Sequence, residues 1–232
     1  MGNVYAVGVG PGSSEYLTDK AKRVIKLCDI VIGYKYTLKT IQDLVKDKQV
    51  YEITMKDQEV TYQKIKQTAR GKMVVVPFTG DVSFSESEVV DRLIEIFKDV
   101  EIIPGISSIQ VAAAKAKVPL DKSKVITLHV STSIEREKIE LQKALIDGFS
   151  VILVPRPWPS EPKKHFMPSE IAYYLKRNGF DTSKMKVRVF EALTTERESE
   201  FEGVVEELEG NEFSDLSVIV FNNHILDSYR NY

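Results

Sequence analysis

The first expected strand runs directly into a glycine-rich loop, and this feature most restricts the fold of the chain. The apolar residues from Val4 to Val7 are followed at once by Gly-Val-Gly-Pro-Gly at 8–12. Glycine adopts positive φ and leaves no side chain in the way, whereas Pro11 fixes its own φ and donates no hydrogen bond. This arrangement predicts a loop whose backbone lies close to a flat ligand, with a turn that binds nothing as the alternative.

The spacing of these glycines differs from that of a dinucleotide-binding fingerprint. The pattern Gly-x-Gly-x-x-Gly needs a glycine three residues after Gly10, and Ser13 stands there instead. The chain also lacks the Gly-x-x-x-x-Gly-Lys-Ser/Thr loop that binds nucleotide phosphates. A module that binds NAD or a nucleotide is therefore the less favoured hypothesis.

Apolar runs alternate with helical patterns, which predicts α/β structure with a parallel sheet. In the first half, strands are expected at 4–9, 30–32, 50–53, 73–78 and 100–103. Val118-Pro119 breaks the pattern, so we expect two α/β domains, at 1–118 and 119–232, with a ligand cleft between them. In the second domain, strands are expected at 125–130, 150–154, 186–190 and 216–221, and helices near 135–147 and 168–178.

The charge of the chain is nearly balanced, with 32 basic and 34 acidic residues. No overall field therefore draws it to nucleic acid or to an anionic membrane. No apolar run reaches the ~20 residues that span a bilayer, and the start lacks the pattern of a signal peptide. The single cysteine, Cys28, excludes an intramolecular disulfide and a multi-cysteine metal site. We expect a cytoplasmic protein without a bound metal, in which Cys28 packs in the core.

Two further loops of small residues follow expected strands. Thr79-Gly80-Asp81 comes after an apolar run, and Pro104-Gly105-Ile106-Ser107-Ser108 comes after another. The carboxyl ends of parallel strands meet at one edge of a sheet, where open α/β sheets bind ligands. We therefore expect the three loops to form one site.

This ordered set of loops, GVGPG, TGD and PGISS, resembles the tetrapyrrole methylase family, a group of two-domain, S-adenosylmethionine-dependent class III methyltransferases. Within the family, the segments VYAVGVGPGSSEYLT, CDIVIGYKYTL and PGISSIQVAAAKAKVPL, the last followed by VITLHV, look like the precorrin-6Y methylase branch. The resemblance covers nearly the whole chain and implies methylation of C5 of cobalt-precorrin-7. Alternative acceptors in the same fold are another corrin intermediate, uroporphyrinogen, a ribosomal RNA ribose or a modified histidine of a translation factor.

The resemblance also implies that S-adenosylmethionine lies between the domains and is bound largely by backbone groups. The matching positions of the first domain are Gly10, Pro11, Gly80, Asp81, Val82, Phe84, Ser107 and Ser108. In the second domain the positions that match the family less clearly are Pro155, Ala192, Leu193, Leu216 and Ser217. Val82 stands where the family usually has proline, which predicts a less constrained loop.

Asp81 is the only acidic residue in the three loops, so its carboxylate is a candidate partner for the cationic cofactor. Ser107 and Ser108 precede an expected helix, and their hydroxyls or the first amides of that helix suit a carboxylate of the ligand. The alternative for both serines is helix capping alone.

The carboxylates of a tetrapyrrole call for cations, and Lys35, Arg156 and Lys163 follow expected strand ends. Tyr34 is a candidate to stack on the macrocycle, although aromatic residues at such junctions also serve packing. Arg156 and Lys163 belong to the segment 155–166, whose four prolines predict no regular structure. This segment is either a lid, a partner surface or a connector.

No catalytic side chain is identified, because methyl transfer to a ring carbon requires orientation more than an activated nucleophile. His129 is a candidate general base, with a packed strand histidine as the alternative. The resemblance implies a homodimer. It also implies a separate decarboxylating C15-methyltransferase as a partner, since the chain stops before the second domain found in fused relatives.

Overall fold

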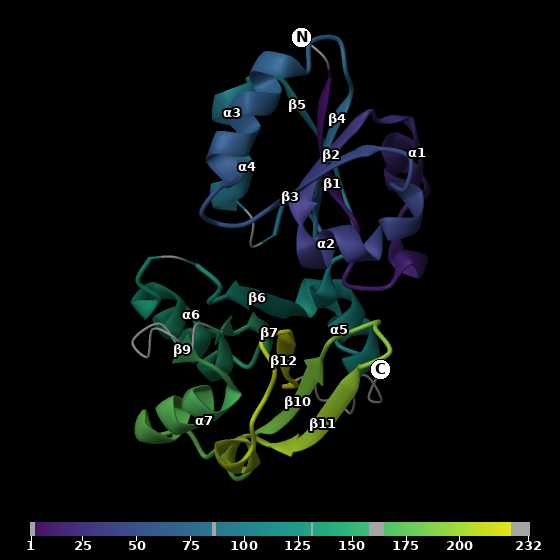
Figure 1. The fold of residues 1–232 in the computed structure, drawn as a ribbon. Coiled ribbons are helices and arrows are strands. Elements are labelled where there is room, and N and C mark those ends of the chain that lie inside the picture. The colour runs from purple at the N-terminus through teal and green to yellow at the C-terminus, as the bar shows by residue number, and fades with distance from the viewer. Residues whose placement is uncertain (1–2, 85–86, 131, 158–164, 224–232) are drawn as a thin grey trace. The chain divides into compact units, whose positions relative to one another are not determined.

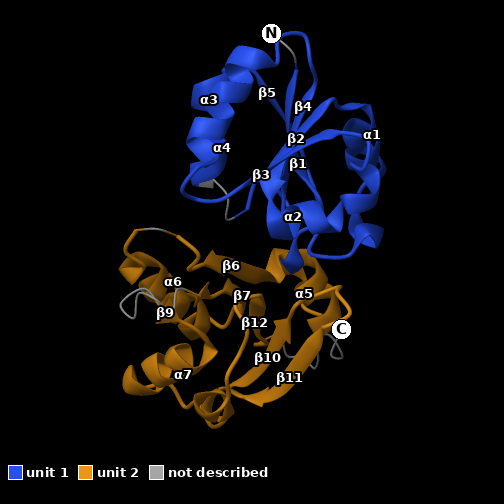
Figure 2. Cartoon of the chain, viewed as in Figure 1, with its two compact units in different colours: residues 1–108 blue, residues 109–232 orange. Residues whose placement is uncertain are grey.

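The structure is a computed structural model and describes residues 3–84, 87–130, 132–157 and 165–223. The chain divides into two compact units, residues 1–108 (unit 1) and residues 109–232 (unit 2), and Figure 2 shows them in different colours. Helix α5 (Ser108–Ala116) falls almost entirely in unit 2. The domain boundary predicted after residue 118 stays a prediction.

Unit 1 is built on a five-stranded sheet in which all pairs of neighbouring strands are parallel (Figure 1). The order of its strands is β3-β2-β4-β1-β5. Their bounds are β1 (Val4–Gly8), β2 (Ile30–Tyr34), β3 (Gln49–Ile53), β4 (Val74–Phe78) and β5 (Val100–Ile103). Each strand coincides with an apolar run of the sequence, so the predicted parallel α/β sheet is confirmed.

Helices cover both faces of this sheet. Their bounds are α1 (Asp19–Leu27), α2 (Lys35–Thr40), α3 (Gln58–Thr68) and α4 (Ser87–Phe97), with short 3-10 turns at Ser14–Tyr16 and Gln42–Leu44. Val74 and Val76 pack in one core cluster with α3 and α4, whereas Val75 packs in another with α1 and α2. Successive strand residues point to opposite faces, so burial of both faces explains the continuous apolar runs.

Unit 2 contains a second five-stranded sheet, of mixed direction, in the order β11-β10-β12-β7-β6. Its strands are β6 (Ser123–Thr127), β7 (Ser150–Val154), β10 (Lys186–Glu191), β11 (Ser199–Val204) and β12 (Ser217–Phe221). Strands β6 and β7 are parallel, and the other neighbouring pairs are antiparallel. Four of these strands were predicted; β11 was missed.

Two helices pack against one face of this second sheet. They are α6 (Glu135–Ile146) and α7 (Pro168–Arg177), both close to their predicted positions, and short 3-10 turns lie at Leu120–Lys122 and Val205–Gly210. Leu141 of α6 and Ile171 of α7 are fully buried in one cluster with Val151 and Ile219 of the strands. Unit 2 is therefore an α/β unit, as predicted, but with a mixed sheet.

The proline-rich segment is partly regular. Strand β8 (Arg156–Pro157) pairs with β9 (His165–Phe166) in an antiparallel ladder. The prediction of no regular structure is therefore wrong at the two ends of the segment. Residues 158–164, with the predicted substrate residue Lys163, lie outside the described residues.

Cys28 is buried in the core, as predicted, and this burial raises the pKa of its thiol to about 11. Among the described residues, no helix has the length and apolar character needed to cross a bilayer. The same part of the chain brings together no group of three or more His, Cys, Asp and Glu side chains able to hold a metal ion.

Candidate functional site

The three glycine loops meet at the carboxyl edge of the unit 1 sheet. The N–H of Gly10 donates to the carbonyl oxygen of Gly80 at 3.2 Å, and the N–H of Gly80 donates to that of Gly10 at 2.7 Å. These two bonds join the loops after β1 and β4 in a short antiparallel bridge. The predicted meeting of these loops is confirmed.

Gly105 brings the third loop into this arrangement. A Cβ atom at Gly105 would lie 2.2 Å from the carbonyl oxygen of Gly80, and one at Gly8 would lie 2.6 Å from the nitrogen of Gly105. Gly80 has a φ of +71°, which a residue with a side chain adopts at a cost. The glycines are therefore required because the three backbones pack directly on one another.

Asp81 fastens the second loop to the third. One carboxylate oxygen accepts the N–H of Ser83 at 2.9 Å, and the other accepts the N–H of Gly105 at 2.7 Å. A carboxylate has about four lone-pair sites, so these two bonds leave acceptor capacity for a cationic ligand. The role of Asp81 as a cofactor contact stays a prediction, and its structural role in joining the loops is new.

Val82 is 1% exposed and packs in the core cluster beneath α3 and α4. Only its backbone is therefore available to a ligand. The N–H of Phe84 donates to the carbonyl oxygen of Asp81 at 3.2 Å, which closes the turn. The burial of Val82 and the bonds of Asp81 restrain this loop, and the expectation that valine in place of proline leaves it less constrained stays a prediction.

The remaining predicted residues of unit 1 lie at the same edge. Pro11 and Ser107 are buried, and Ser108 is the first residue of α5. A Cβ atom at Gly80 would lie 3.6 Å from the Cα of Ser107, so the second and third loops also touch here. This placement suits both interpretations of the serines, ligand binding and helix capping.

The predicted residues of unit 2 also lie together, at one edge of their own sheet. The N–H of Ala192 donates to the carbonyl oxygen of Leu216 at 2.9 Å, and Ser217 pairs with the last residue of β10. Pro155 follows β7, whose carboxyl end lies beside the start of the antiparallel β12. Leu193 is buried next to Ala192 in the sequence. The structure thus brings these five residues to one place.

The loop after β10 is held in a strained conformation by a carboxylate. Ala192 and Thr194 have positive φ angles of +44° and +67°, which are unfavourable for residues other than glycine. Glu198 accepts the N–H of Thr194 at 2.6 Å and pairs with Lys115 of α5 at 2.5 Å. Such strain is common at functional sites. Sequence reasoning missed Glu198, because no spacing rule marks it.

The same interactions control the ionisation of Glu198. Burial raises the pKa of its carboxyl, but the bonds from Lys115 and Thr194 outweigh burial and leave the pKa below its usual value. Glu198 is therefore charged at neutral pH and holds the loop.

Three of the four predicted substrate residues fall among the described residues. Tyr34 ends β2, and its hydroxyl donates to the side-chain oxygen of Gln58 at 2.9 Å. Lys35 is exposed at the start of α2. Arg156 is only 3% exposed, so its guanidinium lies within the protein rather than on an open surface.

Arg156 acts on His129, the candidate general base. His129 is exposed, yet partial desolvation by the surrounding protein lowers the pKa of its imidazole, and the charge of Arg156 lowers it further. The imidazole is therefore neutral at neutral pH, which is the form that accepts a proton.

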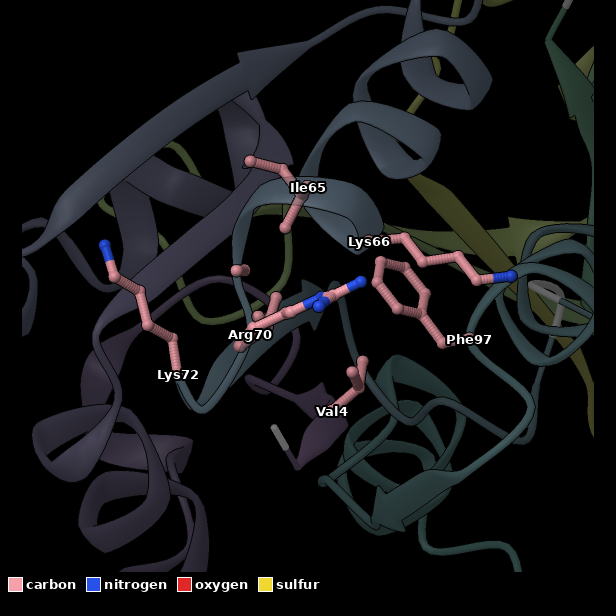
Figure 3. Close-up of a pocket in the computed structure, with 8 residues that line it drawn as sticks. Val4, Ile65, Lys66, Arg70, Lys72 and Phe97 are labelled. Carbon is pink, nitrogen blue, oxygen red and sulfur yellow. The ribbon is translucent and has the colours of Figure 1, made fainter. Parts of the chain in front are cut away.

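Two hollows lie away from these edges. The first, shown in Figure 3, lies at the amino-terminal ends of β1 and β4, where Val4 and Val74 line it with Lys66, Arg70 and Phe97. Its volume is ≈ 20 Å³, room for about one water molecule and too little for a nucleoside-sized cofactor. The second, of ≈ 300 Å³, lies beside the start of β10 and contains none of the predicted cofactor residues.

Comparison with known proteins agrees with the loop geometry. The family model of tetrapyrrole (corrin/porphyrin) methylases matches residues 3–209. The chain belongs to the tetrapyrrole methylase family. Family members use S-adenosylmethionine as the methyl donor, so this chain is an S-adenosylmethionine-dependent methyltransferase of a tetrapyrrole. The predicted family, enzyme class and cofactor are confirmed.

Two relatives come from Methanocaldococcus jannaschii. A probable cobalt-precorrin-7 C(5)-methyltransferase is 30% identical, over 94% of this chain and 97% of the relative. A cobalt-precorrin-4 C(11)-methyltransferase is 37% identical, but over 50% of this chain and 47% of the relative.

Two solved structures share the fold along almost the whole chain. The methyltransferase CobJ superposes with a TM-score of 0.78 at 19% identity, covering 96% of this chain and 95% of that one. The precorrin-6Y methylase CbiE from Archaeoglobus fulgidus superposes with a TM-score of 0.67 at 22% identity, covering 96% and 99%. At these identities the likeness supports the fold alone.

Proposed function

We propose that this protein methylates C5 of cobalt-precorrin-7, a step of cobalamin biosynthesis. The observation that carries the proposal is the similarity to the C(5)-methyltransferase of M. jannaschii, which extends over 94% of this chain and 97% of that protein. The relative named for C(11) methylation aligns with only half of the chain. The first alignment therefore covers nearly all of both chains, whereas the second covers about half of each.

The cofactor-binding part of the proposal begins with the three loops of unit 1. Backbone groups of Gly10, Pro11, Gly80, Val82 and Phe84, the carboxylate of Asp81, and Ser107 with Ser108 would hold S-adenosylmethionine. Two features of the chain fit this cofactor: Asp81 keeps acceptor capacity for a cation, and α5 begins at Ser108 with amides that suit a carboxylate. Further contacts are proposed for Pro155, Ala192, Leu193, Leu216 and Ser217.

When bound, S-adenosylmethionine would supply an electrophilic methyl group to a nucleophilic ring carbon, with S-adenosylhomocysteine as the leaving group. The task of the protein is then to hold two molecules in line, which contributes on the order of 7–11 kcal/mol to such reactions. Neutral His129 is the proposed acceptor of a ring proton, since its lowered pKa keeps the imidazole unprotonated.

The proposal also covers the substrate contacts, the cellular location and the assembly of the protein. Tyr34, Lys35, Arg156 and Lys163 are proposed to contact the substrate. The protein is proposed to work as a cytoplasmic homodimer, with C15 methylation carried out by a separate protein. The balanced charge of the chain supports a small-molecule acceptor over RNA.

Calorimetric titration with S-adenosylhomocysteine tests the cofactor site. Asp81→Asn weakens the acceptor of the Gly105 N–H, so we expect about tenfold weaker binding than in the wild type. Asp91→Asn, the same change on the exposed surface of α4, is the control and should bind as the wild type does. Equal affinity in Asp81→Asn would remove Asp81 from the site.

Incubation with cobalt-precorrin-7 and S-adenosylmethionine labelled on the methyl group tests the acceptor. We expect the label on C5, located by NMR. A label on another ring carbon would overturn the C5 assignment and leave the cofactor site intact.

A further inference from the structure

The carboxyl edge of the unit 1 sheet has two halves of different chemistry. The glycine loops follow the adjacent strands β4, β1 and β5. The other half follows β2 and β3, and it carries Tyr34 and the turn Thr54-Met55-Lys56-Asp57. Because the neighbouring strands are all parallel, both halves lie at the same edge. The cofactor assignment uses only the first half, and in the second half only Tyr34 and Lys35 have so far been given a role, as proposed substrate contacts.

The turn after β3 is fixed by its own hydrogen bonds. One carboxylate oxygen of Asp57 accepts the N–H of Thr54 at 2.6 Å and its hydroxyl at 2.9 Å. The N–H of Gln58 donates to the carbonyl oxygen of Thr54 at 3.1 Å. These bonds also hold the pKa of Asp57 below its usual range. The turn thus presents Met55 and Lys56 in a fixed position.

Met55 forms a ledge with Tyr34. The Met55 side chain is 71% exposed, which is high for a large apolar residue, and its sulfur lies 3.2 Å from the hydroxyl of Tyr34. Gln58, only 1% exposed, accepts the hydroxyl proton of Tyr34 at 2.9 Å. The buried amide therefore fixes the orientation of the tyrosine beside an exposed, polarisable thioether.

This ledge is connected to the glycine half of the edge. Thr37 of α2 is 3% exposed, and its hydroxyl lies 3.4 Å from the hydroxyl of Thr79. Thr79 begins the loop that contains Gly80 and Asp81. Strands β3 and β4 are separated only by β2, so the turn lies about 10 Å along the edge from this loop. A flat macrocycle can span that distance.

Three exposed lysines belong to the segments that carry the ledge: Lys35 follows Tyr34, Lys39 lies on the same helix as Lys35, and Lys56 follows Met55. Lys35 and Lys39 are four residues apart on α2 and therefore lie on the same face of the helix. Within the described part of the chain, none of the three forms an ion pair with a carboxylate. An exposed ledge on segments that also carry these lysines suits a flat ligand that carries several carboxylates.

We propose that Met55 and Tyr34 form the platform on which the tetrapyrrole ring of the substrate lies, with Lys35, Lys39 and Lys56 as partners of its carboxylates. This assignment rests on the proposed function for the identity of the substrate. It adds Met55 and the Thr54–Asp57 turn as determinants of substrate binding. A thioether is adaptable and makes favourable contacts with π-systems, so it suits a macrocycle whose substituents change along a pathway.

The test compares Met55→Ser with Val60→Ser. Val60 is the matched control because it is an apolar residue of α3 that is likewise 71% exposed. Two quantities are measured for each protein: the dissociation constant of uroporphyrin, a stable carboxylated tetrapyrrole, by fluorescence, and the KM for cobalt-precorrin-7. Titration with S-adenosylhomocysteine shows whether the glycine loops remain intact.

We expect Met55→Ser to weaken uroporphyrin binding and raise the KM by about tenfold, with kcat and the affinity for S-adenosylhomocysteine unchanged. Val60→Ser should leave all of these unchanged. Equal effects of the two substitutions, or none, would overturn the platform even if the wild type methylates C5. Loss of a dimer in Met55→Ser with tetrapyrrole affinity unchanged would instead identify a contact between two copies.

Failure of the proposed function has a different signature. A wild type that does not methylate C5, combined with weaker uroporphyrin binding in Met55→Ser, would keep the platform and overturn the acceptor. A wild type that binds neither tetrapyrrole would overturn both proposals.

Discussion

The two sheets of this protein build their loop edges in different ways. In unit 1, the backbones of Gly8, Gly80 and Gly105 pack directly on one another, with no room for a Cβ atom at Gly8 or Gly105. In unit 2, the loop after β10 forces Ala192 and Thr194 into positive φ. The unit 1 edge is therefore formed by residues that have no side chain. The unit 2 edge is formed by residues with side chains that adopt an unfavourable φ.

A carboxylate secures each edge, and this shared feature makes the difference informative. Asp81 accepts the N–H of Gly105 at 2.7 Å in unit 1, and Glu198 accepts the N–H of Thr194 at 2.6 Å in unit 2. In unit 1 the steric fit of glycines adds to this bond. In unit 2 the bond must hold a strained loop. We therefore expect substitutions in the glycine floor, which consists of Gly8, Gly80 and Gly105, to have the larger effects.

The largest effect is expected for Gly105→Ala. A Cβ atom there would lie 2.2 Å from the carbonyl oxygen of Gly80, so two backbone segments would have to separate. We expect the free energy of unfolding to fall by about 3 kcal/mol, measured by urea denaturation, with loss of S-adenosylhomocysteine binding.

Gly210→Ala is the control for this substitution, because a Cβ atom at Gly210 would meet nothing within 4 Å. Its free energy of unfolding should change by at most about 0.5 kcal/mol. A Gly105→Ala protein as stable as this control would show that the glycine floor can move apart to accept a Cβ atom. The contrast between the two edges would then disappear.

The same difference explains how much of the molecule could be predicted from the sequence. The central strands β1, β2 and β4 of unit 1 are buried on both faces, so their apolar runs and the three small-residue loops predicted the sheet and the meeting of the loops. Strand β11 was missed because it is a polar edge strand, on which Glu200 and Glu202 pair with Arg188 of β10. Such a strand has no apolar alternation to detect.

Long-range contacts explain the misses within the site. The bond from Gly105 to Asp81 joins residues of separate loops, and the bond from Tyr34 to Gln58 joins a strand end to a helix. No periodicity or local spacing encodes these pairs. Asp81 was therefore predicted only as a ligand contact, while the exposed Met55 was not predicted at all.

A smaller, pH-dependent effect is expected for Glu198→Gln. The pKa of Glu198 is lowered in the folded protein, so the charged carboxylate stabilises the fold above its ordinary pKa near 4.5. This stability is lost as the pH falls through the lowered folded value. We expect the wild type to exceed the variant by about 1 kcal/mol at pH 7, and the difference to shrink below about pH 4.

Glu196→Gln supplies the comparison for this pH series, since Glu196 is an exposed residue of the same loop. Its stability should parallel that of the wild type at every pH, as followed by thermal unfolding. A difference between wild type and Glu198→Gln that does not change with pH would mean that packing, rather than charge, holds the loop.

The smallest effect is expected for Thr194→Gly, and it has the opposite sign. A φ of +67° is unfavourable for a β-branched residue by about 1–2 kcal/mol, and glycine removes this strain. Glycine also increases the entropy of the unfolded chain, which offsets about 0.4–1 kcal/mol of the gain. We therefore expect the free energy of unfolding to rise by about 0.5 kcal/mol, measured by urea denaturation.

The control for this gain in stability is Glu196→Gly, because Glu196 does not have a positive φ. Glycine relieves no strain there, so only the entropic penalty remains, and the protein should lose about 0.5 kcal/mol. Opposite signs at two positions of one loop would locate the strain at Thr194. If both substitutions destabilise the protein equally, Thr194 is not strained. The carboxylate of Glu198 then fixes the position of the loop after β10 without keeping it in an unfavourable conformation.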